Sequence, residues 1–143
     1  MLKKTIKYTD YDGNEREEDF YFNLSKAELM EMELSQKGGI INLIERVVKE
    51  KDQPKILEIF KDLILRSYGQ KSPDGKRFVK SQEVRDSFEQ TEAYSELFME
   101  IALDEDKAAA FVKAVAPKVS DKEREEYERR VNAIKDGVKK RSQ

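Results

Sequence analysis

The chain is 143 residues long, which suits one domain, or one domain with an appendage. Its 28 Lys and Arg nearly balance its 30 Asp and Glu, so the net charge of −2 gives no electrostatic argument for binding nucleic acid. Cysteine and histidine are both absent, which excludes disulfides, sulfur-ligated zinc and most nucleophilic triads.

The N-terminal segment has the pattern of a β-hairpin. Polar and apolar residues alternate from Lys3 to Tyr8, and Asp12-Gly13 is a strong turn signal. A second strand, roughly Arg16 to Phe22, completes the hairpin. A lone hairpin is marginal in water, so its aromatic face must pack on helices or on another chain. We expect four side chains on that face to be more buried than the polar residues between them: Ile6, Tyr8, Phe20 and Phe22.

A capped helix follows directly, from about Lys26 to Ser35. Ser25 and Glu28 have the spacing of a capping box, in which each residue's side chain bonds the other's backbone N–H. Gly38-Gly39 is a typical helix stop.

Five further helices are predicted before Pro117. They run from about Ile40 to Lys51, from Pro54 to Tyr68, from Ser81 through Phe88, and from Thr91 to Ala102, and a last one begins at Asp104. The helix that contains Phe60 is the most apolar, so we expect it at the centre of the core. Gln70 to Ser81 is predicted to be a long irregular connection with a turn at Ser72-Pro-Asp-Gly75.

The chain changes character after Pro117, where nearly every residue is polar or charged. Its few apolar residues recur every three or four positions, which predicts a helix with a narrow apolar seam: Tyr127, Val131, Ile134 and Val138. We therefore expect a mainly α fold: a small helical domain with an N-terminal β-hairpin over residues 1–117, and a charged C-terminal helical extension over residues 118–143. The extension is either solvated or half of an interface.

Candidate chemical sites are weak throughout the chain. Glu28, Glu31 and Glu33 point to different sides of one helix, and Asp10 to Asn14 fails the spacing of a calcium loop. The basic segment Lys71 to Lys80 lacks the glycine-rich strand-to-helix pattern of a phosphate-binding loop. We predict no catalytic residue, no metal and no cofactor.

The sequence gives more indication of a surface that binds a protein than of a catalytic or metal site. Methionine is flexible and adapts to irregular partners, whereas the aromatic residues are either core or a partly exposed groove. The predicted partner-binding residues are Phe20, Phe22, Met30, Met32, Met99, Tyr127, Val131 and Ile134.

The sequence contains no run of about 18 apolar residues and no apolar block after its basic N-terminus. We therefore expect no membrane span and no signal peptide. A cytosolic or intracellular protein follows from this pattern.

Three segments, Asp19 to Leu34, Tyr68 to Ser81 and Gln90 to Glu100, resemble the tail assembly chaperones of long non-contractile-tailed bacteriophages. The resemblance covers roughly Lys3 to Phe111. It implies a non-enzymatic helper in the host cytoplasm that binds the tape measure protein, keeps it soluble and helps recruit tail tube subunits. It leaves open whether the protein forms a homo-oligomer.

A second hypothesis stays open at this point. The chain could be a small phage or bacterial regulator that binds nucleic acid through Lys71 to Lys80 and its basic C-terminal end. An enzyme is the weakest alternative, because it would have to work from carboxylates and lysines alone.

Overall fold

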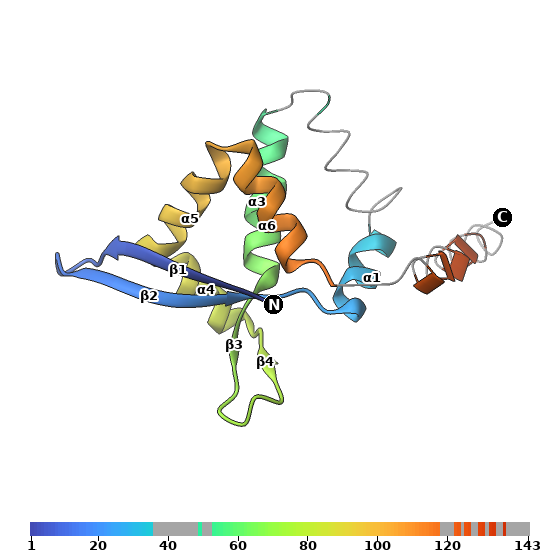
Figure 1. Cartoon of the computed structure of the whole chain (residues 1–143), viewed down its shortest axis with the longest axis horizontal. Helices are drawn as coiled ribbons and strands as arrows, with labels where there is room; N and C mark the ends of the chain where they lie inside the picture. The colour runs from blue at the N-terminus through green and yellow to red at the C-terminus, as the bar shows by residue number, and fades with distance from the viewer. Residues whose placement is uncertain are drawn as a thin grey trace.

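The computed structural model describes residues 1–35, 49 and 53–117, and residues 122, 123, 125, 126, 129, 130, 132, 133 and 136. Within these residues the fold combines an antiparallel sheet with five helices (Figure 1). The strands are β1 (Leu2–Thr9), β2 (Glu15–Phe22), β3 (Tyr68–Lys71) and β4 (Phe78–Val79). The helices are α1 (Lys26–Ser35), α3 (Gln53–Ser67), α4 (Gln82–Glu89), α5 (Glu92–Ala102) and α6 (Glu105–Val115). The helix expected from about residue 40 to 51 lies outside the described residues, apart from Lys49.

The N-terminal hairpin is confirmed, with the register that the alternation predicts. β1 pairs with β2 from Leu2 opposite Phe22 to Thr9 opposite Glu15. Ile6 and Phe22 are buried, and their inward-facing neighbours Tyr8 and Phe20 are half-buried, whereas the alternate polar residues are exposed. The alternation of the sequence therefore places the aromatic face correctly.

The Asp10 carboxylate closes the hairpin turn. Its carboxylate accepts hydrogen bonds from the backbone N–H groups of Asp12 and Asn14 at 3.0 and 2.9 Å, and from Arg16 Nε at 2.6 Å. The bond from Arg16 is the main reason that the pKa of Asp10 lies below its ordinary value. Gly13, with φ of 84°, supplies the left-handed conformation that the turn needs.

The domain is largely helical and has the predicted N-terminal hairpin, but the sheet is larger than the sequence indicated, so the single hairpin is corrected to a four-stranded sheet in a mixed domain. Tyr68 and Gly69, expected at the end of a helix, begin β3 and pair with Phe22 and Tyr21. The connection expected to be irregular is a second hairpin, in which Gln70 and Lys71 pair with β4. The reason is long-range, because Phe22 and Tyr21 offer a strand edge that local preferences cannot reveal.

The turn of this second hairpin follows the expected chemistry. The N–H of Gly75 donates to the carbonyl of Ser72 at 2.9 Å, and Gly75 has a φ of 74°. Ser72 is buried, and its hydroxyl donates to Asp74 Oδ1 at 2.6 Å and accepts from the Arg77 N–H at 3.0 Å. These bonds fix the shape of the turn.

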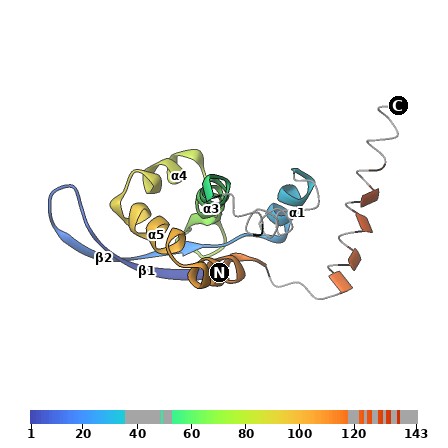
Figure 2. The same ribbon diagram turned by 90° about the horizontal axis from the view of Figure 1, so that it is seen from above.

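One face of the sheet carries the helices, and the other faces solvent. Figure 2 shows α3, α4 and α5 on the same side of the β1–β2 ribbon. Between them lies an aromatic cluster in which the rings of Tyr68 and Phe88 stack with centroids 4.1 Å apart. Phe22 meets Phe88 and Phe111 edge to face, at 5.7 and 5.5 Å. Phe60 is buried in the same core, as expected for α3.

The predicted helix starts are confirmed by their caps. Ser25 Oγ accepts from the Glu28 N–H at 3.1 Å, and Glu28 Oε1 accepts from the Ser25 N–H at 2.9 Å. Ser81, Thr91 and Asp104 cap α4, α5 and α6 through their side-chain oxygens. Local side-chain chemistry therefore determines where these helices begin.

Candidate partner-binding surface

Two large apolar side chains are exposed close together at the C-terminal end of α5. Met99 is 47% exposed and Leu103 is 78% exposed. The Leu103 N–H donates to the Met99 carbonyl at 3.0 Å, so the two residues are one helical turn apart. We call this pair the α5 strip.

The α5–α6 turn explains why Leu103 stays outside. Leu103 is the C-cap of α5, and the next residue, Asp104, caps α6 by accepting from the N–H groups of Asp106 and Lys107. The inward side of α5 is already occupied by Leu97 and Ile101, which are buried. Leu103 is held in a tight turn on the outer side, where a second protein can reach it.

The other predicted partner-binding residues occupy different environments. Phe22 and Met32 are buried in the core at 0% and 4% exposure, so a partner reaches them only if the core opens. Phe20 is half-buried against Phe88, with ring centroids 5.3 Å apart, and Met30 is half-buried on α1. Met99 is therefore the most accessible of the five predicted residues that the structure describes.

The predicted C-terminal seam lies outside the described residues, because Tyr127, Val131, Ile134 and Val138 belong to the undescribed part. The nine described residues between 122 and 136 are helical and exposed. Figures 1 and 2 both place them beyond α1, away from the sheet.

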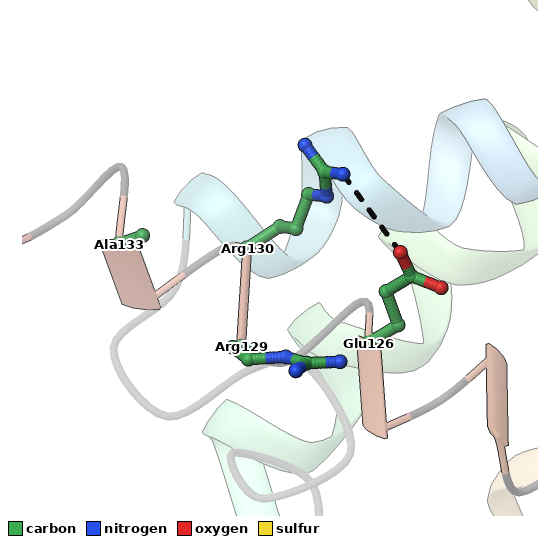
Figure 3. Close-up of a pocket in the computed structure, with 4 residues that line it drawn as sticks. All are labelled: Glu126, Arg129, Arg130 and Ala133. Carbon is green, nitrogen blue, oxygen red and sulfur yellow. Dashed lines mark ion pairs between the residues drawn. The ribbon is translucent and has the colours of Figure 1, made fainter.

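A hollow on this C-terminal segment is lined by charged side chains (Figure 3). Its lining residues are Glu126, Arg129, Arg130 and Ala133. Arg130 Nη2 lies 3.8 Å from Glu126 Oε1, one helical turn away. Exposed ion pairs of this kind contribute little to stability.

Helix α1 is fastened to the second hairpin by a partly buried ion pair. Lys80 Nζ donates to Glu28 Oε2 at 2.7 Å and also to the backbone carbonyl of Asn23. The Lys80 side chain is 10% exposed and that of Glu28 is 31% exposed. One carboxylate therefore both caps α1 and binds the lysine.

The environment shifts the pKa values of both partners downward. Burial lowers the pKa of Lys80, and the hydrogen bond with Glu28 offsets this only in part. Burial alone would raise the pKa of Glu28, but the hydrogen bonds from Lys80 and Ser25 outweigh it, so the pKa falls. The carboxylate is thus kept ionised and holds α1 in place.

The basic segment from Lys71 to Lys80 loses one of its four cations to this pair. Lys71, Lys76 and Arg77 remain exposed on the second hairpin, and Lys71 Nζ lies 4.2 Å from the ring centroid of Tyr21. Three cations on a hairpin that also carries Asp74 give a weak electrostatic basis for phosphate.

No group of three or more acidic side chains within the described part of the chain could hold a metal ion. Within the same residues, no helix is both long and apolar enough to cross a bilayer.

The family model described as phage tail assembly chaperone matches residues 1–141. The chain belongs to this family. The match includes the hairpin, all five described helices and the C-terminal segment. The similarity to this family, first seen in three segments of the sequence, therefore extends over residues 1–141. Neither a curated protein nor a solved structure matches the chain significantly.

Sequence reasoning missed Leu103 in this tail assembly chaperone. Leu103 follows the apolar stripe of α5 and directly precedes the Asp104 cap. The sequence carries no signal for its exposure, because an apolar residue just before an N-cap often packs inward, as the buried Leu24 does before Ser25.

Proposed function

We propose that this tail assembly chaperone binds the tape measure protein, keeps it soluble and helps recruit tail tube subunits, without enzymatic activity. The family match over residues 1–141 carries the proposal. A tape measure protein is long, helical and apolar along one side, so its helper needs an accessible apolar surface on a highly charged body. The chain is 41% charged, and the α5 strip provides such a surface.

The α5 strip suits a partner of variable sequence. Methionine and leucine fill irregular gaps through several rotamers, and Met99 and Leu103 are exposed side by side on a helix end. Binding through a strip of this kind covers apolar residues on the partner and leaves the charged surface of the chaperone in water. The complex would therefore be more soluble than the free partner.

Co-expression of the chain with a tape measure fragment tests the proposal. We expect the soluble fraction of the fragment to rise, and to fall again with the double variant Met99→Ser and Leu103→Ser. Leu57→Ser is the matched control, because Leu57 on α3 is also exposed, at 36%, but lies outside the strip. A fragment that precipitates equally with and without the chain would contradict the chaperone role.

A gel shift on generic DNA addresses the alternative of a nucleic-acid-binding regulator. Binding through phosphates weakens steeply as salt rises, and Lys71, Lys76 and Arg77 would carry it. Salt-sensitive DNA binding that is lost when these three residues are neutralised would favour the regulator. With one of the four cations buried, we expect no shift.

A further inference from the structure

Strand β1 has an open edge. The strand order is β1-β2-β3-β4, so β1 pairs with β2 on one side, and within the described residues no strand covers the other. Alternate residues of such a strand direct their N–H and C=O groups away from the sheet. β1 is eight residues long, which is long for an uncovered edge. An edge of this length can receive a further strand.

The positive charge of β1 determines which kind of strand can pair with its open edge. Three of its residues, Lys3, Lys4 and Lys7, are basic, and none is acidic. A second β1 would bring lysines close to lysines, which opposes pairing with an identical strand. An acidic strand would meet no such repulsion.

β1 already binds an acidic strand on its covered side. Lys7 lies opposite Glu17, and the Thr5 hydroxyl donates to Asp19 Oδ1 at 2.6 Å. The face of β2 that bears Glu17 and Asp19 is exposed, as are Lys3 and Lys7 beside it. The open edge of β1 presents the same lysines, so it has the same preference for an acidic neighbour.

A hollow of about 200 Å³ lies beside one end of this edge, between β1, α5 and α6. Its apolar wall includes Leu2, Ala110, Phe111 and Ala114. At its rim Glu100 Oε1 lies 2.9 Å from Lys4 Nζ and 3.7 Å from Lys107 Nζ. One carboxylate therefore serves two ammonium groups, and the rim keeps an excess positive charge.

We propose that the β1 edge and this hollow bind an extended segment of a partner protein, with acidic side chains at alternate positions followed by a large apolar side chain. The segment adds antiparallel to β1, as β2 does on the other side. In the register that β2 adopts, its acidic side chains lie opposite Lys7 and Thr5, the second of them diagonal to Lys3, and its apolar end lies next to Leu2, at the hollow. This inference does not depend on the tape measure protein.

A labelled peptide with the sequence of Glu15–Phe22 and blocked ends is the probe, used with the full chain and read by fluorescence anisotropy. In the register of β2 its acidic residue equivalent to Glu17 faces Lys7, and its last phenylalanine faces Leu2. We expect saturable binding that weakens with salt. A peptide with lysine at each acidic position tests charge, and one N-methylated at alternate backbone nitrogens tests strand addition.

Two chain variants test the two halves of the site. We expect the double variant Lys3→Glu and Lys7→Glu to lower the affinity for the probe peptide by about tenfold or more. We expect the same of Ala114→Arg. The double variant Lys76→Glu and Arg77→Glu makes the same change in charge on the second hairpin, where both side chains are exposed, and should leave binding unchanged. Ala114 is exposed, so arginine there fills the hollow while circular dichroism reports an intact fold.

Three outcomes would overturn the proposal. One is no binding of the acidic probe, and another is equal binding of the charge-reversed or N-methylated peptide. The third is self-assembly of the chain, seen by light scattering, that Lys3→Glu and Lys7→Glu abolish, because the occupant would then be a second copy. Loss of tape measure solubilisation with the probe still bound would reject the chaperone role alone.

Discussion

Lys80 Nζ lies 2.7 Å from Glu28 Oε2, although the two residues are 52 positions apart in the chain. The same ammonium donates to the carbonyl of Asn23, just before α1 begins. The contact ties the start of α1 to the end of the second hairpin. Helix α1 therefore cannot leave the domain without separating a partly buried ion pair.

Removing the lysine should release α1. We expect Lys80→Met to lower the free energy of unfolding by roughly 1.5–3 kcal/mol, the range for a hydrogen bond to a charged group. The matched control is Lys61→Met, because Lys61 pairs with Glu89 at 3.1 Å but both side chains are well exposed. That change should cost about 0–1 kcal/mol. Urea denaturation measures both, and equal effects would mean that the buried pair has no special role.

Acid should weaken the same contact. The pKa of Glu28 is lower in the folded chain than its ordinary value of about 4.3. Its stabilising contribution is therefore complete above that pH and is lost as the pH falls through the folded pKa. We expect the stability difference between the native chain and Glu28→Gln to shrink on acidification. Denaturation midpoints between about pH 3 and pH 7 measure it, and a constant difference would contradict the assignment.

The sequence predicted the features that depend on neighbouring residues. Alternation placed Ile6 and Phe22 inside, and the capping box at Ser25 appears with both of its hydrogen bonds. It missed β3, because the pairing of Tyr68 with Phe22 joins distant segments and overrides the helical pattern that precedes it. β4 has only two residues, too few for any periodicity.

The candidate site was only partly predictable for the same reason. Met99 is exposed, but Phe22 and Met32 belong to the core, since residue type alone does not tell whether an apolar side chain faces the core or a partner. The partner of Lys80 could not be found from spacing, because a pair between a hairpin and a helix has no sequence period. The open edge of β1 required the strand order.

The core should be far more sensitive than the cap. We expect Phe60→Ala to cost about 3–5 kcal/mol, because it empties space between α3 and the buried cluster. Ser25→Ala should cost roughly 1 kcal/mol through loss of one capping bond of α1. Chemical denaturation of the two variants compares them directly. Equal, small effects would mean that the core is misplaced.

Gly69 should tolerate no side chain. A Cβ built at this position would lie 2.7 Å from Cε2 of Phe78 and 2.9 Å from Cζ, so the ring would have to move. We expect Gly69→Ala to cost about 1–3 kcal/mol and to loosen the second hairpin. Hydrogen exchange at the Gln70–Val79 and Lys71–Phe78 pairs reports that loosening. The double variant with Phe78→Ala should remove the clash, and failure of this rescue would point to another cause.

The C-terminal extension should be dispensable for folding. We propose that residues 1–117 fold without residues 118–143. The ion pair of Lys26 Nζ with Glu123 Oε2, 2.7 Å apart, joins the extension to α1, but the side chains are 58% and 52% exposed, so the pair adds little stability. Truncation after Pro117 should leave the unfolding transition nearly unchanged.

The predicted seam that includes Val131 and Ile134 has most to gain from contact with a second protein, so truncation should weaken partner binding or self-association. Thermal denaturation and light scattering of the truncated chain measure both effects, and a truncated chain that does not fold would place the seam in the core.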